Sequence, residues 1–215
     1  MRALPVKNTL AERAALRGYA RRLAAAPPEF ILTLAKELIR LGDDCRWLGY
    51  ELVAGHRAAF RLVGEAELAE FGRGINSWWT VDAFARTLAG PAWLKGQVSD
   101  GLVLGWAHSP DRWWRRAALA STAALNMRSY GGLGDVSRTL AVCRVLAGDP
   151  DDMVVKAMSW ALRELVPHDP AAVQAFLDEH EHDLAARVKR EVRHKLTTGL
   201  KNPRRPSGRS RAGEG

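Results

Sequence analysis

Apolar residues recur at spacings of three and four along nearly the whole chain, which is the pattern of helices that bury one side. The clearest case is residues 29–41, where Phe30, Leu34, Leu38 and Leu41 share one face. No stretch alternates polar and apolar residues over any length, so the pattern predicts no β-sheet. The predicted helices cover residues 1–26, 29–41, 43–55, 65–71, 78–89, 98–107, 111–127, 135–147, 150–166, 170–178 and 181–199.

Glycine and proline interrupt this pattern where the predicted helices end. The breaks fall at Pro27-Pro28, Gly42-Asp43, Gly72, Gly90-Pro91, Gly131–Gly134, Gly148–Pro150 and Pro167–Pro170. Asp43, Asp149 and Asp169 stand at or next to helix starts, where an aspartate side chain accepts a backbone N–H. We therefore expect these three aspartates to cap helices.

Helices of ten to eighteen residues joined by short turns favour antiparallel helix pairs. Such pairs recur here at a spacing of about thirty to forty residues without strong self-similarity, which is typical of degenerate HEAT-like repeats. A compact helical bundle would give the same periodicity and stays open as an alternative. We expect residues 1–200 to form a single all-α domain and residues 201–215 to form a basic disordered tail.

The composition excludes several classes of protein. With 47% hydrophobic residues in 215, the chain is long and apolar enough for a real core. Two cysteines exclude a disulfide scaffold and a thiolate zinc site, and the six scattered histidines indicate no metal; we expect no cofactor. No apolar run approaches the ~18 residues that span a bilayer, and no secretory signal is visible, so a cytoplasmic protein is expected.

The positive charge is unevenly distributed. Of the net charge of +8, the last fifteen residues carry five basic groups and one acid, or +4, and the other 200 residues carry the remaining +4. A basic tail on a mildly basic body favours a polyanionic partner. A solvated terminus without a partner would have the same composition.

Tryptophan is unusually frequent. The chain has eight, against three tyrosines and five phenylalanines, and six of the eight fall within residues 78–114. Trp78-Trp79 and Trp113-Trp114 are adjacent pairs, and neighbours on a helix point about 100° apart. At least one member of each pair is therefore expected at a rim or cleft.

Three segments combine these tryptophans with charged residues. In the first, Asp82 lies one turn after Trp78, so that the carboxylate and the indole share a face; the aspartate could equally bond backbone or an arginine. In the second, Arg116 lies one turn after Trp113, and its guanidinium could bind a phosphate or pair with an acid such as Asp82 or Asp100. The third, residues 153–164, is by itself an ordinary amphipathic helix.

Taken together and in this order, the three segments resemble bacterial DNA alkylation-repair glycosylases of the AlkD type. That family shows W-x-x-V-D, then W-x-x-R-x-A, then K-A-x-x-W-x-L-R-E. Here the motifs fall at residues 78–82, 113–118 and 156–164, and Asp82 and Arg116 are 34 positions apart. The resemblance extends from about residue 30 to residue 195. It implies a right-handed curved solenoid of HEAT-like antiparallel helix pairs whose concave face holds duplex DNA.

The resemblance also implies roles for individual residues. Asp82 matches the catalytic aspartate, Trp78 and Trp160 match tryptophans that flank the deoxyribose of the lesion, and Arg116 matches an arginine that holds a phosphate. Other members of the matched segments are assigned by their position in them. Arg115 and Lys156 are expected to contact phosphate, and Trp79 and Trp113 are expected at the face that meets the lesion.

The resemblance implies one reaction, the excision of N3- or N7-alkylated purines such as 3-methyladenine and 7-methylguanine, and these residue types suit it. Such a purine is already cationic and leaves without protonation. A carboxylate near C1′ stabilises the cationic sugar and orients water, and indole faces add about 0.5–2 kcal/mol each. No lysine is placed for Schiff-base chemistry, so we expect a monofunctional glycosylase that acts as a monomer.

Two other functions would use the same helical frame. A non-catalytic repeat protein that binds DNA structures would share the basic face but gain nothing from an acid beside phosphate. A protein–protein scaffold would favour an acidic or apolar concave surface, where this chain offers arginine and tryptophan. The position of Asp82 relative to the other site residues discriminates between these functions.

Overall fold

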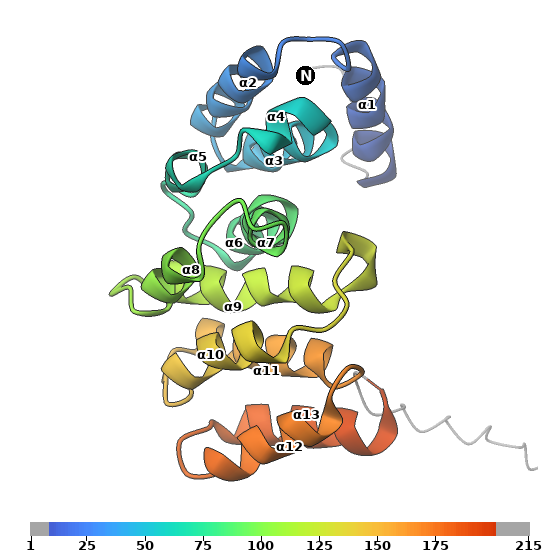
Figure 1. The fold of residues 1–215 in the computed structure, drawn as a ribbon. Coiled ribbons are helices and arrows are strands. Elements are labelled where there is room, and N and C mark those ends of the chain that lie inside the picture. The colour runs from blue at the N-terminus through green and yellow to red at the C-terminus, as the bar shows by residue number, and fades with distance from the viewer. Residues whose placement is uncertain (1–8, 201–215) are drawn as a thin grey trace, which may run out of the picture.

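A computed structural model describes residues 9–200, with side chains for residue 14 and for residues 16–200 (Figure 1). This part of the chain is all-helical and contains no β-strand, which confirms the prediction from periodicity. None of its helices is both long and apolar enough to cross a membrane. The predicted basic tail, residues 201–215, lies outside the described residues.

The helices follow one another with short connections. They are α1 (Thr9–Arg22), α2 (Pro28–Arg40), α3 (Asp43–Gly55), α4 (Arg57–Arg61), α5 (Glu65–Phe71), α6 (Trp78–Phe84), the π-helical segment η1 (Ala85–Ala89), α7 (Gly90–Leu94), α8 (Asp100–Ala107), α9 (Arg112–Asn126), the 3-10 segment η2 (Arg128–Tyr130), α10 (Val136–Val145), α11 (Asp152–Leu165), α12 (Pro170–Glu179) and α13 (Ala186–Thr198).

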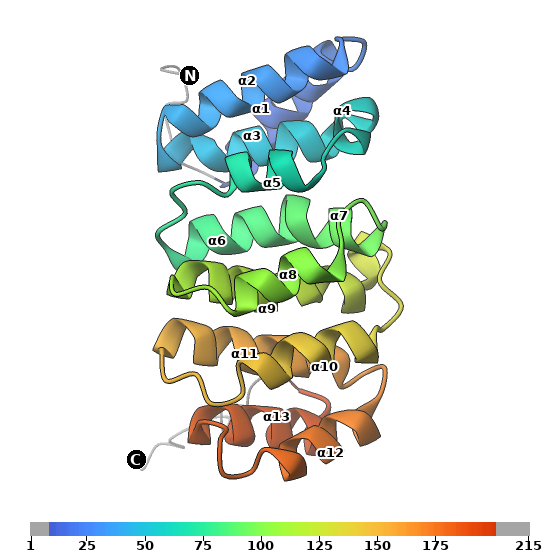
Figure 2. The ribbon, with the colours of Figure 1, turned by 60° about the vertical axis from the view of Figure 1, so that its left-hand side comes forward.

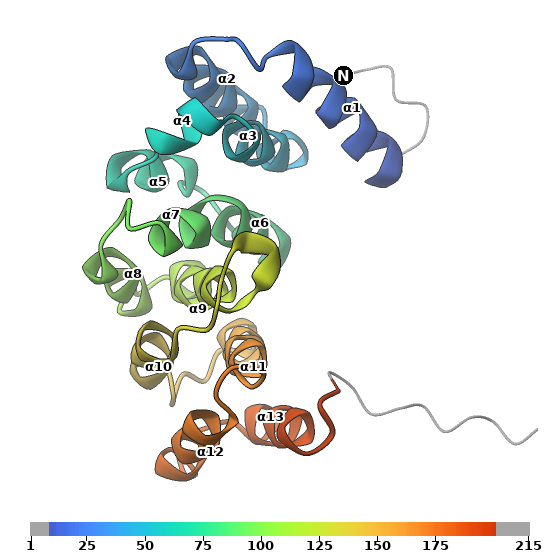
Figure 3. The same cartoon turned by 45° about the vertical axis from the view of Figure 1, so that its right-hand side comes forward.

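Successive helices stack in layers from the N-terminal to the C-terminal end of the molecule (Figure 1). Figure 3 shows two columns, one made of α3, α6, α9, α11 and α13 and the other of α5, α8, α10 and α12. Figure 2 shows the second column from the front. Within the first column α6 packs against α9, α9 against α11, and α11 against α13. Helix α1 contacts α3 and projects on the side of the first column (Figure 3).

Helix α9 is the centre of the core. Every residue from Arg116 to Asn126 is buried, because α6, α7, α8, α10 and α11 all pack against this helix. Small residues allow the neighbouring helices to approach α9 closely. A Cβ atom added to Gly90 of α7 would lie 2.6 Å from the Ser121 carbonyl oxygen, nearer than real Cβ contacts allow.

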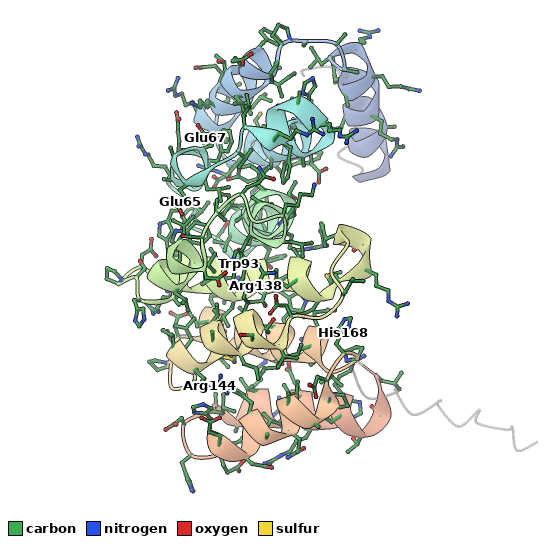
Figure 4. All side chains as sticks on the ribbon, viewed as in Figure 1. Glu65, Glu67, Trp93, Arg138, Arg144 and His168 are labelled. Atoms are coloured by element: carbon green, nitrogen blue, oxygen red, sulfur yellow. The ribbon has the colours of Figure 1, made fainter. Side chains whose placement is uncertain are left out.

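Adjacent layers are also tied by polar contacts. Arg138 of α10 donates to the Trp93 carbonyl of α7 at 3.0 Å, and its guanidinium lies 5.1 Å from the Trp93 ring centroid (Figure 4). The Trp93 Nε1–H donates to Asp100 at 2.7 Å. Because Trp93 is buried with its N–H paired, it belongs to the core and not to a binding face.

The helix does not break at Gly90-Pro91, and this prediction is wrong. The chain continues from α6 through η1 into α7 with helical dihedral angles. A proline within a helix removes one N–H and crowds the carbonyl of the preceding turn. The wider π turn over Ala85–Ala89 ends two residues before Pro91, where it can relieve such a conflict.

Some predicted helix ends also differ from the structure. Gly42 is the N-cap of α3, so Asp43 lies in its first turn, and Asp151 instead of Asp149 caps α11. The prediction for Asp169 is confirmed, since its carboxylate accepts from the Ala172 N–H. The helix predicted over residues 1–26 ends at Arg22, the one predicted from residue 181 begins at Ala186, and the short α4 was not predicted.

Candidate functional site

The first motif forms the start of α6. Thr80 Oγ1 accepts the Ser77 N–H at 3.2 Å and fixes the first turn. Trp78 is 58% exposed, which confirms that the first tryptophan pair places one indole at the surface, whereas Trp79 is half-buried. Asp82 follows Trp78 by one turn, and its side chain is 19% exposed.

Asp82 and Arg116 form a bidentate ion pair between α6 and α9. The Arg116 Nε–H donates to Asp82 Oδ1 at 2.9 Å, and Nη2 donates to Oδ2 at 2.8 Å. The third bond runs from Nη1 to the Met153 carbonyl oxygen of α11 at 2.5 Å. Arg116 is only 7% exposed, so the pair joins three helices and holds the carboxylate in one orientation.

The other charged residues of α9 are also paired. Asp111 caps the helix by accepting the Trp113 N–H. Arg115 donates to Asp149 at 2.6 Å and to the carbonyl oxygens of Ser109 and Pro110. The Arg115 guanidinium therefore fastens the start of α9 to the turn before α11.

The second tryptophan pair lies at the start of α9. Trp113 is half-buried, with the Arg112 guanidinium 4.7 Å from its ring centroid. Trp114 packs edge-on against Phe84, at 5.9 Å between centroids, and against Trp106 at 5.1 Å. Both indoles are half-buried, so this pair places none fully at the surface.

The third motif lies on α11. Asp151 caps this helix; burial raises the pKa of its carboxyl, but hydrogen bonds from the Met153 N–H and Arg112 outweigh burial, so the pKa is below its ordinary value. Lys156 donates to Asp152 at 2.6 Å, one turn earlier on the same helix. The lysine is 38% exposed, and its charge is balanced by this acid.

Trp160 is held from two sides. Its Nε1–H donates to Glu164 Oε1 at 3.0 Å. The Arg86 guanidinium lies 5.7 Å from the Trp160 ring centroid and 5.9 Å from that of Tyr130 in η2. Arg86 follows Asp82 by one turn, on η1.

Arg86 was not singled out in the sequence, although its spacing of four from Asp82 is a usable signal for a shared face. Its contacts with Trp160 and Tyr130 could not be read from spacing, because they join three separate segments. No group of three or more potential metal ligands is found among the described residues.

The three sequence motifs thus converge on three helices that pack against one another. Asp82 and Arg116 are in direct contact, the Met153 carbonyl connects them to the third motif, and Arg86 connects the Asp82 helix to Trp160. The Asp82–Arg116 pair is one of the two alternatives that the sequence left open for this arginine. Trp79 makes no aromatic pair or side-chain hydrogen bond within the described part of the chain.

Comparison with known proteins identifies the family. No curated protein and no solved structure matches this chain. A family model described as DNA alkylation repair enzyme matches residues 8–196, which include all three motifs and nearly all of the described residues. The chain belongs to the family of DNA alkylation repair enzymes, as its motifs suggested.

Proposed function

We propose that this protein is a monofunctional DNA glycosylase for cationic alkylated purines. It hydrolyses the N-glycosidic bond of N3- or N7-alkylated purines, such as 3-methyladenine and 7-methylguanine, in duplex DNA. Family membership supports a role in DNA alkylation repair and implies DNA as the substrate. The observation that carries the finer proposal is Asp82, a partly exposed carboxylate that Arg116 holds one helical turn from an exposed tryptophan.

The chemistry follows from the charge of the lesion. As the bond from C1′ to the purine nitrogen breaks, its electron pair neutralises the alkylated purine and leaves positive charge on the sugar. The Asp82 carboxylate stabilises this charge electrostatically. Water then attacks C1′, and its proton passes to Asp82 or to solvent. The products are a free neutral purine and an abasic site in an intact strand.

Rigid placement makes this carboxylate effective. Stabilisation of a developing charge is strongest when the stabilising group needs no rearrangement during the reaction. Arg116 supplies that rigidity through two bonds to Asp82 and one to α11. A guanidinium has five N–H donors, so two remain for a phosphate of the lesion strand. We therefore assign Arg116 both to positioning Asp82 and to phosphate contact.

Trp78 and Trp160 contact the cationic nucleotide in this proposal. Trp78 is exposed and on the same face as Asp82, and Trp160 is fixed by Glu164. Each indole face would favour the positive charge by about 0.5–2 kcal/mol. Trp79 and Trp113 are proposed as outer members of this aromatic face, and both are half-buried. Arg115 and Lys156 are proposed as phosphate contacts, although each is paired with an aspartate.

We also propose an architecture in which residues 1–200 form a single domain, a right-handed curved solenoid of HEAT-like antiparallel helix pairs. The two columns of helices in Figure 3 support this proposal, with the column of α3, α6, α9, α11 and α13 as the concave face. All three motifs lie on helices of that column. The protein would bind double-stranded DNA as a monomer and act on the nucleoid in the cytoplasm.

The test is release of 7-methylguanine from a methylated duplex under single-turnover conditions, with wild type beside Asp82→Asn. We expect release by wild type, abasic sites without strand cleavage, and a loss of about 100- to 1000-fold in the variant. Affinity for undamaged duplex should be retained in Asp82→Asn. If neither protein releases base while both bind duplex, the protein is a non-catalytic DNA-binding repeat protein. Strand cleavage without added base would contradict the monofunctional mechanism.

A further inference from the structure

Arg86 is the feature of the site that the motifs do not account for. It lies on the π-helical segment η1, and its guanidinium lies over the rings of Trp160 and Tyr130, 5.7 and 5.9 Å from their centroids. Its Nε atom is buried and has no hydrogen-bond partner among residues 9–200. Within the same residues its side chain forms no ion pair. Buried polar groups are usually paired. Because solvent does not reach Nε, a ligand would be bound through the terminal Nη groups of this guanidinium, which no described group pairs with.

The neighbouring cations differ from Arg86 in this respect. Arg116 is paired with Asp82, Arg115 with Asp149 at 2.6 Å, and Lys156 with Asp152 at 2.6 Å. A phosphate bound by any of these cations would share the positive charge with a carboxylate that is already bound. Arg86 carries a full charge that is not balanced by a carboxylate, and two aromatic rings limit its movement. A preorganised, unpaired guanidinium is the better ligand for a phosphate oxygen.

We propose that Arg86 binds a phosphodiester group of the DNA next to the nucleotide on which Asp82 acts. This inference deepens the proposed function and rests on it. Tyr130 is the positioning residue for Arg86, because its ring covers the guanidinium from η2. The segment that joins α9 to α10 thereby becomes part of the DNA-binding surface. The π turn, a feature frequent at functional sites, is what presents Arg86 one turn beyond Asp82.

The experiment measures how affinity for a short undamaged duplex depends on salt, for wild type, Arg86→Met and Arg86→Lys. Each phosphate neutralised adds about 0.9 to the slope of log K against log salt. We expect Arg86→Met to reduce the slope by about 0.9 and Arg86→Lys to retain it. The matched control is Lys95→Met, because Lys95 also lies over an aromatic ring, Phe60 at 4.5 Å, and has no described carboxylate partner. Its slope should equal that of wild type.

A second variant tests the support given by Tyr130 and serves if Arg86→Met folds poorly. Tyr130→Ala keeps the charge of Arg86 but frees the guanidinium, so affinity should fall about 2- to 10-fold without a change of slope. Tyr130→Phe, which retains the ring, should bind as wild type does. Thermal unfolding of every variant reports whether the fold is retained.

The outcomes separate this inference from the proposed function. An unchanged slope in a folded Arg86→Met, with a lower melting temperature, would make Arg86 a structural support for η2 and overturn the inference. If wild type releases no 7-methylguanine but Arg86→Met still lowers the slope, the phosphate contact stands and the glycosylase proposal fails. If wild type releases 7-methylguanine and Arg86→Met leaves the slope unchanged, the glycosylase proposal stands and the phosphate contact of Arg86 fails.

Discussion

Replacing Arg116 by methionine removes the guanidinium that fixes Asp82 and keeps most of the side-chain volume. Two charged hydrogen bonds between α6 and α9 are lost, together with the bond to the Met153 carbonyl oxygen. Asp82 then keeps its negative charge without a counter-ion. The variant therefore tests whether the ion pair positions the carboxylate or has no role in catalysis.

The expected loss of stability follows from the burial of the two partners. Removing one partner of a buried ion pair costs about 3–5 kcal/mol, because the other charge is left uncompensated. Asp82 is 19% exposed and water can solvate part of its carboxylate, so the lower end, about 3 kcal/mol, is expected. In a chain of this size 1 kcal/mol shifts the melting temperature by about 2–4 °C, which gives a decrease of about 6–12 °C.

Catalysis should fall further than stability alone explains. A carboxylate displaced by about 1 Å can lose about 100-fold in rate, so single-turnover release of 7-methylguanine should be about 100-fold slower in Arg116→Met. Arg116→Lys restores the charge but not the bidentate geometry and should recover only part of the rate. The salt slope of duplex binding then shows how much of the role of Arg116 is phosphate contact, at about 0.9 per contact.

Two results would refute this reasoning. A loss of stability below about 1 kcal/mol would mean that the pair behaves as an exposed one, which contributes little. A wild-type rate of release in Arg116→Met would mean that Asp82 needs no positioning. A double-mutant cycle with Asp82→Asn measures the coupling directly, and we expect about 2 kcal/mol.

Four further predictions concern other parts of the molecule. Trp78→Ala should change stability by less than about 0.5 kcal/mol, because Trp78 is 58% exposed, but should slow base release by about 2- to 30-fold through the lost cation–π contact. Gly90→Ala should lower the free energy of unfolding by about 1–3 kcal/mol, since its Cβ would collide with the Ser121 carbonyl of α9, whereas Gly105→Ala, with open space at its Cβ, should not lower it in the same denaturation assay. Burial raises the pKa of Glu191, but hydrogen bonds from Ser159 and Arg187 and the charge of Arg163 outweigh burial, so the pKa lies below its ordinary value of 4.5. The stability that Glu191 contributes is therefore present above about pH 4.5 and is lost as the pH falls through the lowered pKa. In denaturation experiments Glu191→Gln should be less stable than wild type at pH 7, and the two proteins should become equally stable in acid. Deleting residues 201–215, which hold five cations, should reduce the salt slope of duplex binding by up to about 4.5, and an unchanged slope would exclude the tail from the interface.

Local patterns in the sequence predicted the elements that depend on local interactions. The helix over residues 65–71 has the bounds that were predicted, and it ends at Gly72, which was one of the predicted breaks. The i,i+4 pair of Asp152 and Lys156 was equally accessible from spacing. Periodicity reports which residues share a face of one helix, and such contacts do not depend on the rest of the chain.

Contacts between distant segments were not accessible in the same way. Spacing offered Asp82 and Asp100 as partners for Arg116, but only packing of α6 on α9 selects Asp82, while Asp100 accepts from Trp93. The continuous helix through Pro91 depends on a π turn that no local pattern marks. The surroundings of Arg86 were inaccessible for both reasons. Arg86 lies on the π turn, and its aromatic neighbours Trp160 and Tyr130 come from two other segments.

The distribution of charge at the site bears on which lesions the proposed enzyme would accept. Arg116 and Lys156 are each balanced by an aspartate, so the surface around Asp82 is less positive than the number of its cations suggests. A neutral base offers this arrangement no charge to attract and would leave as an anion unless it were first protonated. A cationic purine is attracted by the carboxylate and leaves as a neutral molecule, so the same aspartate that stabilises the sugar cation also favours the charged lesion. Selectivity for cationic adducts would therefore arise from the electrostatics of Asp82 and its partners.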